Sequence, residues 1–186
     1  MNKALLVMDY QTDIVAMLGD KGPPVVERAG QLVAAARAAN VPIIYVVVGF
    51  RPGYPEASPR NKNLAVVMKT GRFQGTTPGA DIVEGLKPAD GDVIVVKHRA
   101  GSFASSDLDM VLRVRDIHSL ILLGLSTSGV VLSTVRHAAD HDYEITVARD
   151  GCADGDDEVH RVLMDKVFVR QANVATCAEI IAGLAA

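Results

Sequence analysis

The sequence predicts an α/β fold in which a parallel β-sheet lies between two layers of helices. Short apolar runs alternate with longer segments of helical periodicity along the chain. Most of these runs lack polar alternation, which is typical of strands covered on both faces. Strand–helix alternation of this kind favours parallel strands joined by right-handed crossovers. The 186 residues suit one domain, and no internal repeat or linker divides them.

The elements can be assigned by residue range. The expected strands are Ala4–Met8, Pro42–Val48, Asp92–Val96, Ser119–Leu123, Glu144–Val147 and the weaker Asn173–Ala175. The expected helices are Val25–Asn40, Ser106–Val114, Gly129–Asp140, Glu158–Val167 and Thr176–Leu184. Residues 49–77 interrupt the alternation and are rich in Pro, Gly, Arg and Asn. Long insertions at such a place usually form lids or subunit contacts, so we expect one of these roles here.

Composition excludes several classes of protein. The chain is 49% hydrophobic with no Trp, so its core must be aliphatic. The net charge is −3 and the basic residues are scattered, which argues against nucleic acid and membrane surfaces as partners. Two cysteines, Cys152 and Cys177, make no disulfide framework and favour a reducing compartment. The apolar run before Asp9 is too short for a signal peptide or a membrane span. We therefore expect a cytoplasmic protein.

Ionisable residues follow two of the expected strands. In open α/β sheets, ligands bind beyond the carboxyl ends of the strands. Asp9 follows the first strand and Lys97 the third. Taken singly, each could be a helix cap or a side chain that extends to solvent. Taken together, they place a carboxylate and an ammonium at one edge, where burial would tune their protonation. They are the candidate catalytic residues.

A small polar turn, Ser126 to Gly129, follows the fourth strand and opens a helix. Unpaired N–H groups at a helix N-terminus suit a carboxylate or a developing oxyanion, although the serines could equally serve only as caps. The expected substrate-binding residues around the site are Tyr10, Gln11, Phe103, Thr127, Ser128 and Gly129. Arg51, Arg60 and Arg72 could bind a carboxylate if the 49–77 segment closes over the site, but such arginines are more often surface residues.

Four segments carry these strand-end residues. They read "ALLVMDYQTD" at 4–13, "VIVVKHRAGSFASSDL" at 93–108, "LLGLSTSGVVLSTVRHAADHDY" at 122–143 and "ARDGCADGDDEVHRVLM" at 148–164. Together they resemble the isochorismatase-like (cysteine hydrolase) superfamily over essentially the whole chain. The resemblance implies a three-layer α/β/α sandwich with a six-stranded parallel sheet, the Rossmann-like fold of that family. It also implies a hydrolase that acts on a small-molecule substrate and assembles as a homodimer or homotetramer.

The resemblance assigns roles to three positions. Amidases of the superfamily use an Asp, a Lys and a Cys, and the first two map to Asp9 and Lys97. The Cys position is occupied by Val130. In the amidases the Asp takes the thiol proton and the thiolate attacks the amide carbon, which are general properties of an activated nucleophile. A valine cannot form the acyl-enzyme, so this route is closed at Val130.

Several explanations of Val130 remain open. The family's isochorismatases also lack the Cys and hydrolyse a vinyl ether with the Asp as acid, and we prefer such cysteine-independent acid–base hydrolysis of a small polar metabolite. Valine is bulkier than the glycine of those enzymes, and their turn carries a His, so isochorismate itself is in doubt. The alternatives are a thiol relocated to Cys152, a valine introduced into an ordinary cysteine hydrolase, and a homologue that only binds its ligand.

No metal or nucleotide cofactor is predicted. Some nicotinamidases of the superfamily bind zinc after the second strand, but the corresponding stretch here is "GFRPGYP". His137 and His141 have helical spacing, yet no third ligand accompanies them in a recognised motif. No phosphate loop or GxGxxG fingerprint follows any expected strand.

Overall fold

The computed structural model of the chain describes residues 2–75 and 77–184. These residues form a six-stranded sheet in the order β3-β2-β1-β4-β5-β6, with every neighbouring pair parallel. The strands are β1 (Lys3–Met8), β2 (Ile43–Val48), β3 (Val93–Lys97), β4 (Ser119–Leu125), β5 (Glu144–Ala153) and β6 (Asn173–Ala175). The predicted parallel α/β fold is confirmed. The strand order reverses between β1 and β4, which is where such sheets usually bind ligands.

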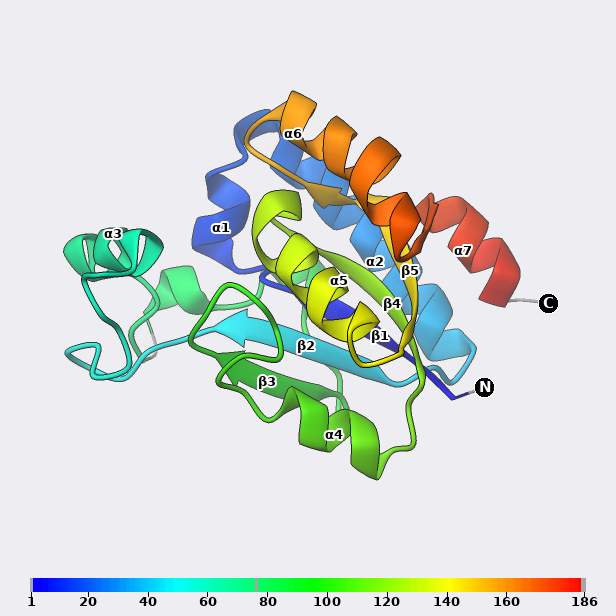
Figure 1. The fold of residues 1–186 in the computed structure, drawn as a ribbon, viewed down its shortest axis with the longest axis horizontal. Helices are drawn as coiled ribbons and strands as arrows, with labels where there is room; N and C mark the ends of the chain where they lie inside the picture. Colours follow the sequence, from blue (N-terminus) through cyan, green and yellow to red (C-terminus); the bar gives the residue numbers. More distant parts are fainter. Residues whose placement is uncertain (1, 76, 185–186) are drawn as a thin grey trace.

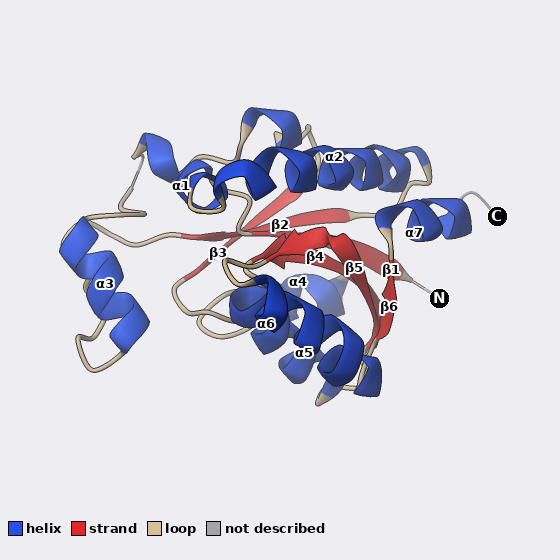
Figure 2. Cartoon of the chain, turned by 90° about the horizontal axis from the view of Figure 1, so that it is seen from above, coloured by secondary structure: helices blue, strands red, loops and turns tan. Residues whose placement is uncertain are grey.

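Helices cover both faces of the sheet (Figure 1). The helices are α1 (Thr12–Ala16), α2 (Gly22–Ala38), α3 (Lys62–Thr70), α4 (Leu108–Val114), α5 (Leu132–Ala139), α6 (Asp157–Val162) and α7 (Cys177–Leu184). Figure 2 shows α1, α2 and α7 on one face and α4, α5 and α6 on the other. In both views α3 stands apart from these two layers, beyond the tip of β2. No helix in the described ranges is long and apolar enough to cross a membrane.

The central strands form the core because both of their faces are covered. In β1 every residue from Ala4 to Met8 is buried, and β4 is buried from Leu120 onward. Gly124 lets these two strands approach closely, since a Cβ there would lie 3.0 Å from the Met8 Cβ and 3.1 Å from the Met8 carbonyl oxygen. The edge strand β3 is different, and its Ile94 and Val96 stay about half exposed.

The 49–77 segment contains a helix that the sequence analysis did not predict. Asn61 caps α3 by accepting hydrogen bonds from the N–H groups of Asn63 and Leu64, and Gly71 ends the helix in the left-handed conformation at φ 69°. A small apolar cluster of its own supports this segment, made of Phe50, Tyr54, Leu64 and Phe73. The abundance of Pro, Gly and Asn on both sides of α3 concealed it in the sequence.

Two further boundaries differ from expectation. The short helix α1 lies between the first expected strand and the first expected helix, where the sequence predicts no element. Strand β5 runs to Ala153 instead of ending at Val147. Its register with β4 shifts between Leu122 and Gly124, so the polar residues after Val147 bulge and then resume pairing at Cys152. The break in apolar character at Arg149 therefore marks an irregular strand and not a loop.

Candidate active site

Asp9 and Lys97 meet across β2. Asp9 directly follows β1 and its N–H donates to the carbonyl oxygen of Val46, while Lys97 ends β3 and pairs with Val48. The Lys97 Nζ lies 2.9 Å from the Asp9 Oδ2. Asp9 also has a left-handed backbone, with φ 59°, a conformation that is uncommon in non-glycine residues but that Asp adopts more readily than most. Two residues that are 88 positions apart in the chain (97 − 9) thus form one ion pair.

Both members of this pair are buried, and Asp9 is only partly satisfied. Asp9 is 5% exposed and Lys97 2%. Burial raises the pKa of the Asp9 carboxyl, and the neighbouring Lys97 opposes that rise without cancelling it. Within the described residues, the Asp9 Oδ1 is buried without a hydrogen-bond partner, whereas the Lys97 Nζ also donates to the carbonyl oxygen of Arg99 at 3.0 Å. An unsatisfied buried oxygen is costly, so Oδ1 is ready to hold a proton or a ligand.

The ion pair opens into a cavity of about 390 Å³. The volume is within the usual range for small-molecule sites. The walls are mostly apolar and come from the ends of β1, β3 and β4 together with α1 and α3. The lining residues are Asp9, Ile14, Met17, Val48, Asn61, Asn63, Leu64, Val66, Val67, Thr70, Arg72, Phe73, Lys97, Arg99, Ala100, Leu125, Ser126, Gly129 and Val130. The three predicted catalytic positions therefore share one cavity, with an isopropyl group at the third.

The turn after β4 is held by the protein itself. The N–H groups of Gly129 and Val131 donate to the carbonyl oxygen of Ser126 at 3.2 and 3.3 Å. The Ser128 N–H donates to the Asp154 carboxylate at 2.7 Å. Three of the N–H groups expected to hold an oxyanion therefore already have acceptors. The Ser126 side chain makes no capping hydrogen bond, so the Ser126 carbonyl and the Asp154 carboxylate hold the turn in place of the expected serine caps.

Of the six expected substrate-binding residues, only Gly129 lines the cavity. The Thr127 hydroxyl is fully buried and bonds to the His160 Nδ1 at 2.8 Å, and the Ser128 N–H is held by Asp154. The Thr127 side chain thus points to α6, whereas Ser128 is exposed, and neither residue lines the cavity. The turn is too short for consecutive side chains to point the same way.

The other three also point elsewhere. The Tyr10 side chain lies in the core, where its hydroxyl donates to the carbonyl oxygen of Gly151. Phe103 stacks on His137 with ring centroids 4.3 Å apart. The Gln11 side chain accepts from the Val48 N–H at 2.8 Å and donates to the Val48 and Ala80 carbonyl oxygens. The polar groups of Tyr10 and Gln11 thus bind neighbouring backbone, because buried polar groups must find protein partners.

The two thiols are not placed for catalysis. Cys152 lies within β5, is 4% exposed and is absent from the residues that line the cavity. Burial raises the pKa of its thiol to about 12, so very little thiolate exists at neutral pH. Cys177 is also buried, and burial likewise raises its pKa. The relocated-thiol explanation finds no support in this geometry.

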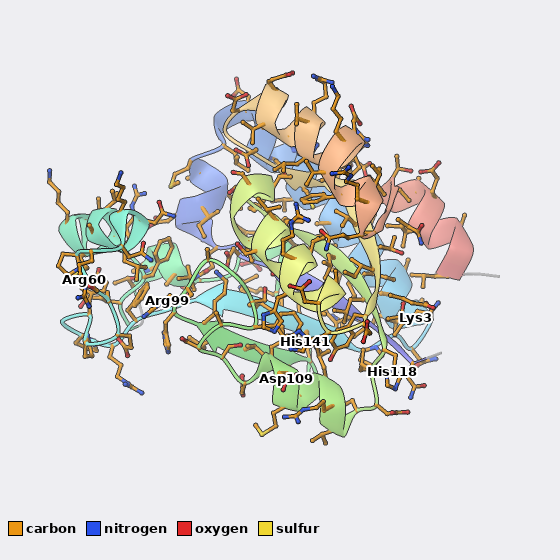
Figure 3. All side chains as sticks on the ribbon, viewed as in Figure 1. Lys3, Arg60, Arg99, Asp109, His118 and His141 are labelled. Carbon is orange, nitrogen blue, oxygen red and sulfur yellow. The ribbon has the colours of Figure 1, made fainter. Side chains whose placement is uncertain are left out.

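Several cavity residues were not predicted. Arg99 and Ser126 follow β3 and β4 and so are among the strand-end residues, but the sequence analysis assigned no binding role to either of them. The polar residues of the α3 segment gave no signal because the helix itself was missed. Among the three arginines considered earlier, Arg72 lines the cavity, whereas Arg51 pairs with Glu56 at 3.2 Å. Figure 3 shows Arg60 on the outer part of the α3 segment and Arg99 at the carboxyl end of the sheet.

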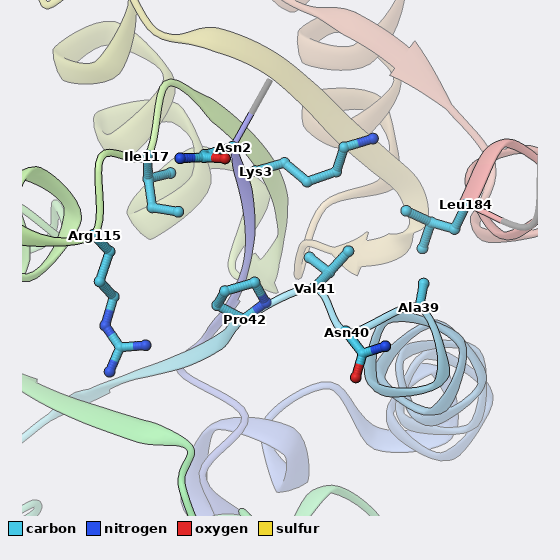
Figure 4. Close-up of a pocket in the computed structure, with 9 residues that line it drawn as sticks. All are labelled: Asn2, Lys3, Ala39, Asn40, Val41, Pro42, Arg115, Ile117 and Leu184. Atoms are coloured by element: carbon cyan, nitrogen blue, oxygen red, sulfur yellow. The ribbon is translucent and has the colours of Figure 1, made fainter.

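A second cavity, of about 520 Å³, lies at the amino ends of the strands (Figure 4). Its lining residues are Asn2, Lys3, Ala39, Asn40, Val41, Pro42, Arg115, Ile117 and Leu184. No carboxylate, imidazole, thiol or hydroxyl is among them, so Lys3 has no partner there that could form a catalytic pair like Asp9 and Lys97. The side chains of Lys3 and Arg115 also extend to opposite sides of it (Figure 4). Across residues 2–75 and 77–184, no three His, Cys, Asp or Glu side chains are grouped so as to hold a metal ion.

Comparisons with known proteins agree with the geometry. The chain is 33% identical to the isochorismatase family protein YecD of Escherichia coli O157:H7, over 97% of this chain and 95% of that protein. It is also 33% identical to the ureidoacrylate amidohydrolase RutB of Pseudomonas savastanoi pv. phaseolicola, over 75% of this chain and 66% of that one.

A solved structure supports the same assignment. The crystal structure of a cysteine hydrolase from Pseudomonas syringae pv. phaseolicola 1448A superposes with a TM-score of 0.91 and 26% identity, covering 99% of this chain and 92% of that one. The model of the isochorismatase domain matches residues 3–179. The chain therefore belongs to the isochorismatase family of hydrolases.

Proposed function

We propose that this protein hydrolyses a small molecule of the vinyl-ether type by acid–base catalysis, without a covalent intermediate. Asp9 is the acid and Lys97 its electrostatic partner. The observation that carries the proposal is the buried Asp9–Lys97 ion pair at 2.9 Å, in a cavity whose third catalytic position is Val130. A buried carboxyl with a raised pKa holds its proton at higher pH than an exposed one and can deliver it to carbon.

The reaction can be written so that every atom is accounted for. The Asp9 proton adds to the terminal vinyl carbon, and the ether-bearing carbon becomes an oxocarbenium ion. Water adds to that carbon and returns a proton to the Asp9 carboxylate. The hemiketal then breaks its bond to the ether oxygen, its hydroxyl proton passes to that oxygen, and a ketone and an alcohol are released. Lys97 stabilises the Asp9 carboxylate after the proton has been transferred to carbon. The apolar walls strengthen that interaction by excluding water.

A second candidate is amide hydrolysis in which Asp9 acts as a base toward water. The relative RutB is named as an ureidoacrylate amidohydrolase, and this likeness favours an amide substrate. In that case the water oxygen attacks the amide carbon directly, because Val130 supplies no nucleophile. The Lys97 ammonium would then be the nearest cation to the oxyanion that forms.

The test is turnover of a panel of vinyl ethers, amides, carbamoyl compounds and lactams by three proteins. The natural chain should hydrolyse a vinyl ether, Asp9→Asn should lose about 10²-fold or more of that rate, and Cys152→Ala should keep it. Amide turnover that is lost in Asp9→Asn would support the second candidate. Loss of activity in Cys152→Ala, with alkylation at that thiol, would restore the relocated nucleophile.

A further inference from the structure

The cavity that contains Asp9 holds more positive than negative charge. Its lining includes one carboxylate, Asp9, and three cations, Lys97, Arg72 and Arg99. Lys97 is neutralised by Asp9 at 2.9 Å. Arg72 has a weaker partner, since its Nε lies 3.7 Å from the Asp13 carboxylate and its Nη1 contacts the Met17 sulfur at 3.0 Å.

Arg99 is the third of these cations, and within the part of the chain that the structure describes it has no acidic partner. Among the described residues it forms no ion pair, and its Nη1 donates only to the neighbouring carbonyl oxygen of His98, at 2.6 Å. It is partly buried and lines the cavity two residues beyond Lys97. A guanidinium is charged at every accessible pH, and its planar fork matches a carboxylate. A partly buried cation that lines a cavity and has no acidic partner is available to bind an anionic group of a ligand.

The remaining lining residues indicate what kind of ligand surface the cavity can bind. Part of its wall is apolar, with Ile14 from α1, Leu64 and Val67 from α3, and Phe73 from the loop after α3. Burying apolar ligand surface against such walls stabilises binding by about 25 cal/mol per Å². The other two cations of the cavity, Lys97 and Arg72, already have acidic neighbours. Among the described lining residues, no further unpaired cation is available for a second anionic group of the ligand.

We infer that the substrate is a monocarboxylate with an apolar body, that Arg99 binds its carboxylate, and that α1 and α3 hold its body. This inference rests on the proposed function only in treating the cavity as the substrate site. The sequence analysis expects a small polar metabolite as the substrate. The inference specifies that only one end of this molecule is polar. Arg99 thereby becomes the residue that determines specificity, and it takes no part in proton transfer.

The experiment compares two probes of nearly equal shape, 2-naphthoate and 2-naphthamide, by calorimetric titration. The natural chain should bind the carboxylate at least about tenfold more tightly than the amide, as one charged hydrogen-bonded pair predicts. Arg99→Gln should bind both probes equally and keep the natural affinity for the amide. Arg60→Gln, which removes the same charge outside the cavity, should keep the preference.

Other outcomes overturn the inference. The inference is wrong if the natural chain binds the two probes equally or does not bind naphthoate. It is also wrong if Arg99→Gln keeps the preference for naphthoate, because Arg72 would then be the residue that binds the carboxylate. Should Arg99→Gln not fold, the natural chain still decides, because its preference must shrink as salt rises from about 0.02 to 0.5 M. The readout is binding alone, so failure of the hydrolysis proposal would appear separately, as absence of turnover in the Asp9→Asn comparison.

Discussion

Asp9 and Lys97 show how strand-end residues can be selected from sequence. Each stands at the end of an apolar run, and parallel strands bring their carboxyl ends to one edge. The prediction said nothing about β2, which lies between them and fixes their separation through Val46 and Val48. The sequence shows that a carboxylate and an amine follow these two strands. The 2.9 Å contact between them depends on the register of three strands.

The protonation state of Asp9 predicts how the rate of hydrolysis depends on pH. Burial raises its pKa above the ordinary value of 3.8, so the acid form persists to higher pH than in an exposed Asp. In the vinyl-ether reaction Asp9 must carry the proton. We therefore expect kcat/KM to fall tenfold per pH unit once the pH exceeds the raised pKa, and to be level below it.

The measurement is a pH–rate profile, with Asp9→Asn as the control for spontaneous acid hydrolysis. The opposite limb, in which kcat/KM rises with pH through the same pKa, would mean that Asp9 works as a base. That outcome would favour amide hydrolysis over the vinyl-ether reaction.

Helix α3 connects the 49–77 segment to the cavity. It was missed because its cap, its few apolar residues and its left-handed glycine are surrounded by loop-forming residues. Once formed, it contributes residues from Asn61 to Thr70 to the cavity wall. The expectation of a lid or a subunit contact stays a prediction. The structure adds that α3 forms part of the cavity wall and that the shape of this wall depends on the Asn61 cap.

The cap supports a second prediction. Asn61→Ala removes the acceptor for the N–H groups of Asn63 and Leu64, which should destabilise α3 by about 1 kcal/mol. We expect KM to rise about fivefold with little change in kcat, since the wall loosens while Asp9 and Lys97 stay in place. Steady-state kinetics measures this split.

Two variants separate the cap from direct contact with substrate. Asn61→Ser keeps a capping oxygen and should restore KM, and failure to do so would mean that the Asn61 amide itself binds the ligand. Asp156→Ala removes an equivalent cap from α6, where Asp156 accepts from Glu158 and Val159, and should leave KM unchanged.

The packing of the whole sheet depends on the close approach of β1 and β4. A Cβ at Gly124 would press on the Cβ and carbonyl oxygen of Met8, and these atoms cannot move without shifting the strand that carries Asp9. Gly124→Ala should lower the free energy of unfolding by about 1–3 kcal/mol, the usual cost of overpacking a core.

Denaturant unfolding monitored by circular dichroism tests this prediction. Gly155→Ala is the matched control, because nothing lies within 4 Å of a Cβ placed there, and its effect should stay within about 0.5 kcal/mol. An equal effect of the two substitutions would show that the β1–β4 contact has room for a methyl group.

The sequence by itself determined the class of fold, the carboxylate and amine of the site, and the absence of a thiol at Val130. Each of these follows from local pattern or covalent identity, which no folding step can change. The tertiary structure decided which neighbours face the cavity, because side-chain direction depends on contacts between distant segments. It turned Tyr10 toward Gly151 and Phe103 toward His137, and it left Arg99 at the cavity wall with no acidic partner among the described residues. Burial, which raises the pKa of Asp9, likewise exists only after strands and helices have packed around it.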